Sequence, residues 1–171
     1  MLAPINVNGR IQPAFFYQST AQFMNKRLKQ FISNKEGKAL DLGCGQLQDI
    51  KGLETLGWFC EGVDLPKVDL ENYYLSQQAP FDLVYCNYVL HLIQNKKILI
   101  KSAYDNLKKD GWLFIHVFDK SDKNGDSSVT IPKMRLLLKD FQNITTKVFS
   151  LYDDDEGHRH WHKVIEATAQ K

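Results

Sequence analysis

The chain has the size and composition of one globular domain. It contains 171 residues, 43% of them apolar, with 22 Lys and Arg against 20 Asp and Glu and a formal net charge of +2. A chain of this length buries about 70% of its unfolded surface, which suffices for one core, and its near-neutral charge gives no support for a nucleic-acid partner. Three cysteines, Cys44, Cys60 and Cys86, form neither a disulfide framework nor a CxxC pair, which favours a reducing, cytoplasmic compartment.

The hydropathy pattern argues against export and against insertion in a membrane. The N-terminal segment lacks an apolar run of signal-peptide length, and no stretch approaches the ~18 apolar residues of a membrane span. We expect one domain over residues 1–171, either a monomer or a homodimer, without a membrane partner. Its expected parts are an N-terminal lead-in and helix at 1–35, a ligand-binding core at 36–118, and a C-terminal helix and hairpin at 119–171.

Strand and helix patterns alternate along the chain. Helices are expected at residues 14–33, 47–56, 95–107 and 132–141, the last with Thr130 as its cap. Strands are expected at residues 38–42, 58–64, 81–86, 112–118, 143–151 and 160–169. Only an acidic loop joins the last two strands, so they should pair antiparallel. The pattern predicts an α/β doubly wound, Rossmann-like fold, with a mainly parallel sheet, an antiparallel C-terminal hairpin and a ligand at the carboxyl ends of the strands.

The most informative motif is Asp41-Leu-Gly43-Cys-Gly45, directly after the first predicted strand. Two glycines allow a sharp turn that brings the backbone against a ligand, although a tight turn without a ligand is the simpler alternative. Asp64 ends the next predicted strand, where a carboxylate can accept hydrogen bonds from both hydroxyls of a ribose. Together, these features indicate a cofactor of the adenosine type.

The rest of the turn separates two cofactor classes. The NAD fingerprint requires a third glycine where this sequence has Gln48, which disfavours a nicotinamide-dependent reductase. The segments ALDLGCG, GVD, FDLVYCNYVLHL and LKKDGWLFI, in that order, resemble the motifs of the class I S-adenosylmethionine-dependent methyltransferases across roughly residues 36–118. Within that family, KVDLENYYLSQQAPFDLVYCNYVLHL and the ending HWHKVIEATAQK are similar to the small tellurite-resistance-type enzymes.

The resemblance implies a set of cofactor-binding residues. In the family, the acid that matches Asp41 positions the methionine amino group, the glycine turn lies against the methionine moiety, and the acid that matches Asp64 holds the ribose. Asp69 and Leu70 match a position that contacts adenine, and Tyr17 matches a lead-in segment that reaches over the methionine end. The expected cofactor site comprises Tyr17, Asp41, Gly43, Cys44, Gly45, Asp64, Leu65, Asp69, Leu70, Cys86 and Asn87.

The sequence departs from the family pattern after the second predicted strand. Only residues 65–80 separate Asp64 from Phe81, which is too few for a helix, a strand and their loops. We therefore expect the fold to be shortened by about one βα unit, with the family's third strand reduced at most to residues 68–70. A shortened adenine wall should leave the adenine ring more exposed and weaken cofactor binding.

Catalytic residues are less evident than binding residues. Methyl transfer to a thiolate or a reduced chalcogen requires alignment rather than a base. If the acceptor is a hydroxyl or a nitrogen, His91 and His116 are the candidate general bases. Cys44 and Cys86 are expected to line the site rather than to act as nucleophiles.

Two other features favour structural interpretations. His158, His160 and His162 alternate, which in a strand places all three on one face, but an exposed polar face explains this spacing without a metal, and we expect none. Lys26, Arg27 and Lys29 are expected to form a solvated helix face rather than a nucleic-acid surface.

The sequence therefore predicts a small cytoplasmic methyltransferase that binds S-adenosylmethionine and methylates a small molecule. No proline follows Asn87, which disfavours a methylase of exocyclic base nitrogens, and the chain leaves little room for a recognition domain for a macromolecule. The alternative is a degenerate methyltransferase fold that acts as a binding or regulatory module, because one βα unit is missing.

Overall fold

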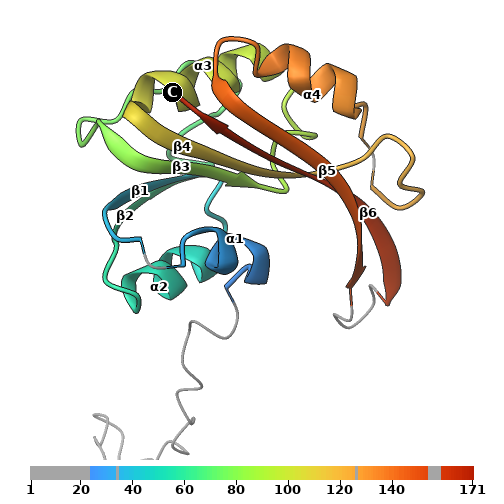
Figure 1. Cartoon of the computed structure of the whole chain (residues 1–171), viewed down its shortest axis with the longest axis horizontal. Coiled ribbons are helices and arrows are strands. Elements are labelled where there is room, and N and C mark those ends of the chain that lie inside the picture. Colours follow the sequence, from blue (N-terminus) through green and yellow to red (C-terminus); the bar gives the residue numbers. More distant parts are fainter. Residues whose placement is uncertain (1–23, 34, 126, 154–158) are drawn as a thin grey trace, which may run out of the picture.

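The protein forms one six-stranded sheet with helices on both faces (Figure 1). The computed structural model describes residues 24–33, 35–125, 127–153 and 159–171. The strands are β1 (Lys38–Leu42), β2 (Phe59–Val63), β3 (Phe81–Asn87), β4 (Leu107–Phe118), β5 (Gln142–Asp153) and β6 (His160–Gln170). The helices are α1 (Lys26–Phe31), α2 (Gln48–Glu54), α3 (Lys96–Asn106) and α4 (Ile131–Leu137). No helix in the described ranges is long and apolar enough to cross a membrane.

The sheet has the order β2-β1-β3-β4-β6-β5. Strands β2, β1, β3 and β4 are mutually parallel, whereas β6 runs antiparallel to both β4 and β5. Helices α1 and α2 cover one face and α3 and α4 the other, and the hairpin of β5 and β6 curves beyond them (Figure 1). The predicted Rossmann-like fold with its antiparallel C-terminal hairpin is confirmed.

A separate apolar cluster lies on each face of the sheet. Leu28 of α1 and Ile32 directly after it pack with Leu53, Trp58 and Phe114 in the smaller cluster. The larger cluster lies on the side of α3 and α4 and includes Leu99, Met134 and Ile165. Successive side chains of β1 and β3 point to opposite faces of the sheet and so pack into both clusters. These two strands are therefore buried almost throughout.

The boundaries of several elements differ from their predicted positions, and those of β4 and α1 differ most. Strand β4 begins at Leu107 rather than at Trp112, because residues 108–111 are accommodated as an irregularity in its pairing with β3, with Asp110 at φ +62°. In the described part of the lead-in, α1 begins at Lys26. The Asn25 side chain accepts hydrogen bonds there from the backbone N–H groups of Arg27 and Leu28, which caps the helix. The expected helical segment before residue 24, including Tyr17, lies outside the described residues.

The expected shortening after β2 is present. Residues 65–80 form neither a helix nor a strand, so β2 lies at the edge of the sheet and residues 68–70 pair with no strand. Instead, side chains anchor the segment: the hydroxyls of Tyr74 and Ser76 each donate a 2.6 Å hydrogen bond to the Glu61 carboxylate, and Leu70 is buried in the larger cluster.

Candidate active site

The glycine turn after β1 is tied closely to the end of β2. The N–H of Gly43 donates to the Val63 carbonyl at 2.8 Å, and the Asp64 carboxylate accepts from the N–H groups of Gly45 at 2.8 Å and Leu65 at 2.7 Å. Gly43 has φ +94°, and a Cβ there would lie 2.2 Å from Cγ2 of Val89. This position therefore requires glycine for two independent reasons.

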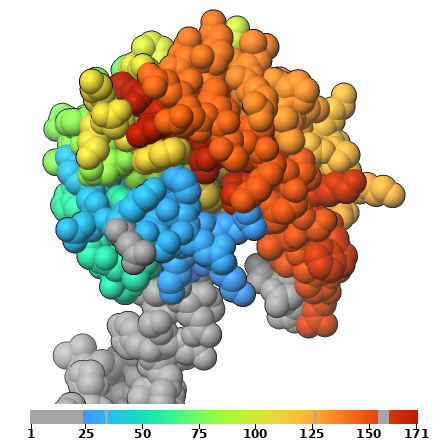
Figure 2. Space-filling view, in the orientation of Figure 1, coloured from blue at the N-terminus to red at the C-terminus, as the bar shows by residue number. Residues whose placement is uncertain are grey.

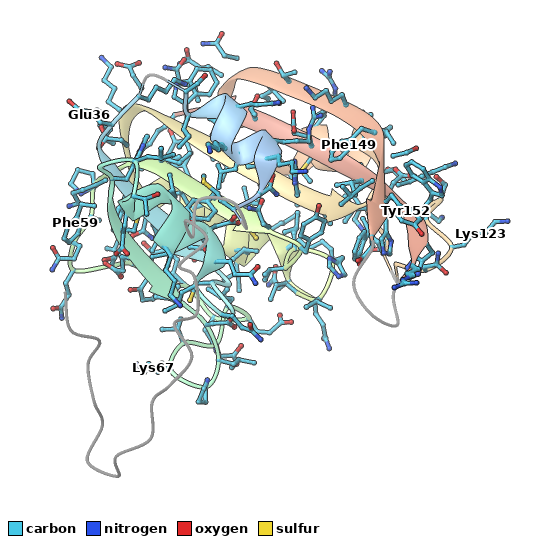
Figure 3. The ribbon with its side chains drawn as sticks, turned by 90° about the horizontal axis from the view of Figure 1, so that it is seen from below. Glu36, Phe59, Lys67, Lys123, Phe149 and Tyr152 are labelled. Carbon is cyan, nitrogen blue, oxygen red and sulfur yellow. The ribbon has the colours of Figure 1, made fainter. Side chains whose placement is uncertain are left out.

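A cavity of about 510 Å³ opens beside this turn, at the carboxyl ends of β1, β3 and β4. Its walls come from the glycine turn, the start of α2, the residues after β3, the N-terminal end of α1, and β5. Its lining includes Asn25, Arg27, Asp41, Gly43, Cys44, Gly45, Asp49, Asn87, Tyr88, His116, Phe149, Leu151 and Tyr152. In Figure 2 the blue atoms of α1 adjoin the orange atoms of β5, and Figure 3 shows Phe149 and Tyr152 on β5, with Phe149 toward α1.

One end of the cavity is acidic and holds two buried acceptor atoms that no described donor satisfies. Oδ1 of Asp41 and Oδ1 of Asn87 are both buried and accept no hydrogen bond from any described residue. Asp49 is engaged, since its carboxylate accepts from the Asn25 N–H and from Nδ2 of Asn87, both at 2.7 Å. Burial raises the pKa of Asp41 well above its usual range, and the nearby charge of Asp49 adds to this effect. A cation with several N–H donors would supply both the missing donors and the missing charge.

The residue after Asn87 has an uncommon backbone conformation. Tyr88 has φ +59°, and its N–H donates to the His116 carbonyl at 2.8 Å. A bulky side chain rarely adopts this left-handed conformation, which is frequent at functional sites. The conformation turns the chain after β3 so that both Asn87 and Tyr88 line the cavity.

The other end of the cavity holds a polar cluster around His116, which is 1% exposed. Nδ2 of Asn25 lies 2.9 Å from Nδ1 of His116, and Nε2 of His116 lies 3.1 Å from Oε2 of Glu166. Glu166 also accepts hydrogen bonds from Arg27 and pairs with Lys147 at 2.9 Å. The cluster joins α1 to β4, β5 and β6.

The structure brings together some of the predicted site residues. Asp41, Gly43, Cys44, Gly45, Asn87 and His116 all line the cavity. Asp64 adjoins it through its hydrogen bond to Gly45. These residues come from the four parallel strands and the turns that follow them, as expected for carboxyl ends that share one edge.

Other predicted residues lie elsewhere. Cys86 is 2% exposed, belongs to the larger apolar cluster and does not line this cavity. Leu70 is buried in the same cluster, while Leu65 is 68% exposed and Asp69 binds the N–H of Glu71. His91 packs against Phe118 with ring centroids 4.9 Å apart and does not line the cavity.

Several cavity residues were not identified from the sequence. Asn25 and Asp49 contribute polar groups to the cavity lining. Glu166 lies behind His116 and pairs with Arg27, which therefore does not belong to a solvated face. One sequence feature could have identified Glu166, because it is a single charge within the otherwise apolar part of β6. Asn25 could have been identified as a helix cap, because it directly precedes the basic run that forms α1.

The histidines of β6 have structural partners. His162 is buried, with Nδ1 3.2 Å from Oδ1 of Asp122, and Asp122 also accepts from the backbone N–H groups of Asn124, Gly125 and Lys163. The ring of His162 stacks on that of Phe118, with the ring centroids 4.5 Å apart. His158 lies outside the described residues, and no group of three metal-ligating side chains occurs within them.

Comparison with known proteins identifies the family. Residues 17–164 match the family described as a methyltransferase domain, whereas a search of curated proteins finds no match. Among solved structures, TehB from Haemophilus influenzae has a TM-score of 0.67 at 18% identity; the match covers 85% of this chain but only 60% of TehB. A SAM-dependent methyltransferase from Archaeoglobus fulgidus has a TM-score of 0.64 at 13% identity, covering 89% of this chain and 92% of that one.

A third solved structure carries ligands. The 1,6-didemethyltoxoflavin-N1-methyltransferase from Burkholderia thailandensis, with 1,6-didemethyltoxoflavin and S-adenosylhomocysteine bound, has a TM-score of 0.61 at 16% identity, covering 90% of this chain and 77% of that one. At such identities these neighbours show the fold, while the family match spans most of the chain. The chain belongs to the methyltransferase-domain family.

Proposed function

We propose that this protein binds S-adenosylmethionine in the 510 Å³ cavity and transfers its methyl group to a small molecule. The observation that carries the proposal is the pair of cavity-lining residues Asp41 and Asn87, whose Oδ1 atoms are buried and accept no hydrogen bond from the described residues. An ammonium group supplies three donors and a positive charge. The α-ammonium of the methionine moiety therefore fits this end of the cavity.

S-adenosylmethionine supplies an electrophilic methyl group on a sulfonium sulfur. The protein's own residues orient the bound molecule: Asp41 and Asn87 hold the amino group, and Gly43 and Gly45 leave room beside the turn. Asp64 already accepts two backbone hydrogen bonds, but each of its oxygens has a further lone pair that can accept from a ribose hydroxyl.

The adenine side of this proposed site is open. Residues 65–80 contribute no helix or strand there, and the side chain after Asp64, Leu65, is 68% exposed. An exposed ring gains less from burial, so we expect weaker binding of the adenosine part than an enclosed site would give. The same feature supports the second candidate function, a binding or regulatory module of this fold.

The acceptor is proposed to be compact. The cavity must also hold the methionine part of the cofactor, and its remaining wall is formed by Tyr88, Phe149 and Tyr152. A cytoplasmic location remains part of the proposal on the grounds of cysteine usage alone.

Calorimetric titration with S-adenosylmethionine and S-adenosylhomocysteine tests the proposal. Binding to the wild type that is weakened about 10- to 150-fold in Asp41→Asn but kept in Asp140→Asn, a matched change on an exposed residue after α4, supports the assigned site. Absence of binding to the folded wild type would favour the binding module. Binding of S-adenosylmethionine that is never converted to S-adenosylhomocysteine, whichever compact acceptor is added, would also favour the binding module.

A further inference from the structure

We propose that His116 is the general base of the methyl transfer and that the acceptor is a neutral alcohol, phenol or amine whose O–H or N–H proton passes to Nδ1 of His116. This inference rests on the proposed function and specifies the substrate class of the same site. The Asn25 amide, which caps α1, and the Glu166 carboxylate together fix which ring nitrogen of His116 carries the proton.

The first step is the orientation of Asn25. Its Oδ1 accepts from the N–H groups of Arg27 at 3.0 Å and Leu28 at 3.1 Å, so the amide oxygen is committed to the cap of α1. Its Nδ2 therefore faces Nδ1 of His116 at 2.9 Å. An amide nitrogen only donates, so Nδ1 must accept and carries no proton.

The second step is the position of Glu166 behind the ring. The imidazole proton resides on Nε2, which points to Oε2 of Glu166 at 3.1 Å. Burial opposes ionisation of Glu166, but hydrogen bonds from Arg27, Lys147 and His116 outweigh it and lower its pKa to about 2. Glu166 therefore remains a carboxylate and can stabilise an imidazolium in front of it, as in other pairs of histidine and carboxylate.

The third step is the charge of the ring itself. Burial lowers the pKa of His116, and Arg27 acts in the same direction, whereas Glu166 and Asp49 act against them. The ring is therefore neutral near neutral pH, and its lone pair on Nδ1 accepts from Nδ2 of Asn25. The titratable groups that face this cluster from α1, α2, β5, β6 and the turn after β3 are Arg27, Asp49, Lys147, Glu166 and Tyr88.

The reaction balances with these groups. In the reaction the Asn25 side chain turns away from His116 and gives up its cap of α1, and the acceptor's X–H group replaces it at Nδ1. The acceptor's lone pair forms the new bond to the methyl carbon, and the carbon–sulfur bond leaves its electron pair on sulfur. The proton of X–H passes to Nδ1, and the imidazolium later releases it to solvent. A thiolate or an oxyanion has no such proton, so its methylation requires no general base.

Ring-nitrogen NMR tests the tautomer without any acceptor. In protein labelled at its five histidines and complexed with S-adenosylhomocysteine, the His116 signals, assigned by comparison with His116→Gln, should show Nε2 protonated and Nδ1 unprotonated at neutral pH. A protonated Nδ1 would overturn the proposal.

Two substitutions of Asn25 form a matched pair for this measurement. Asp and Ser both cap helices well, so neither should melt α1. A carboxylate at this position only accepts, so Asn25→Asp should move a proton to Nδ1, while the shorter Asn25→Ser should leave Nδ1 unprotonated. Equal spectra for the two variants would contradict the assigned contact.

Turnover of a panel of matched alcohols, phenols, amines and thiols tests the substrate class, with release of S-adenosylhomocysteine as the readout. We expect turnover of an O–H or N–H compound whose kcat rises as His116 loses its proton, with the midpoint below the ordinary histidine value of 6.5. His116→Gln should lower kcat by about 10²–10⁴-fold and flatten the pH profile while it still binds S-adenosylhomocysteine. His91→Gln, outside the cavity, is the matched control and should retain the wild-type rate.

Glu166 acts through His116 and is a positioning residue. Glu166→Gln should lower kcat more than it changes KM and shift the rising limb of the profile to lower pH, because the imidazolium loses its partner. Turnover of thiols alone, an unchanged rate in His116→Gln, or no turnover of any O–H or N–H compound by cofactor-bound protein would each overturn the inference. Loss of cofactor binding in the wild type would instead refute the proposed function.

Discussion

Replacement of Asp41 by Asn should have opposite effects on cofactor binding and on stability. In the protein without ligand, the Asp41 carboxyl is 3% exposed, its Oδ1 accepts no hydrogen bond from the described residues, and its pKa is raised by burial and by Asp49. An amide of the same shape removes the cost of ionising this group. The free energy of unfolding of Asp41→Asn should therefore equal or exceed that of the wild type near neutral pH.

The bound state should respond in the other direction. A hydrogen bond between charged groups contributes about 1.5–3 kcal/mol, which corresponds to a loss of affinity for S-adenosylhomocysteine of about 10- to 150-fold in Asp41→Asn. The affinity of the wild type should also rise with pH through the raised pKa of Asp41. An ammonium ligand requires the ionised carboxylate, so binding below that pKa releases a proton.

Calorimetry in buffers of different ionisation enthalpy measures both the affinity and the released proton, and urea denaturation measures the stability. The pH dependence of binding that Asp41 causes should be absent from Asp41→Asn. A variant that binds as tightly as the wild type, or one that loses binding only because it unfolds, would refute the reasoning.

Three further predictions concern the turn, the polar cluster and the irregular segment. Gly43→Ala should lower the thermal midpoint, because its Cβ would lie 2.2 Å from Cγ2 of Val89 at φ +94°, and Val89→Ala should restore part of that loss in a thermal scan; equal midpoints for Gly43→Ala and the wild type would contradict this. The pKa of Glu166 is lowered from 4.5 to about 2, so the stability that this carboxylate contributes is present above pH 4.5 and is lost as the pH falls toward about 2. Urea denaturation across that range should show a steeper acid loss for the wild type than for Glu166→Gln, and parallel curves would refute it. In the same assay, Leu70→Ala should lower the free energy of unfolding by about 2–4 kcal/mol and Leu65→Ala by less than about 0.5 kcal/mol, because only Leu70 is buried. Similar losses for the two variants would show that residues 65–80 do not pack as described.

Local patterns were sufficient to predict most of the sheet. The bounds of β1 agree residue for residue with the prediction, because Lys38–Leu42 is a short apolar run that ends in a glycine turn. Counting the residues between Asp64 and Phe81 was enough to predict the missing βα unit. The start of β4 was missed because Gly111 and the preceding lysines indicate a stop, whereas the structure absorbs them as an irregularity within the strand.

The candidate site was predicted in part. Asp41, Gly43 and Gly45 lie within one motif, so their proximity follows from the sequence. Contacts such as that of His116 with Glu166, 50 residues later, depend on which strands pair and in what register, and no local pattern encodes that. The burial of Cys86 likewise depends on which face of the sheet its side chain occupies, and that of Leu70 on how the segment 65–80 packs against the larger cluster.

A crystal structure of the protein with S-adenosylhomocysteine would test the central claim most directly. We expect the amino group of the ligand within hydrogen-bond distance of Oδ1 of Asp41 and Oδ1 of Asn87, beside the Gly43 turn, with the adenine largely exposed beyond Asp64. A ligand whose amino group lies away from these two oxygens, or a folded protein that remains without ligand at saturating concentration, would contradict the account.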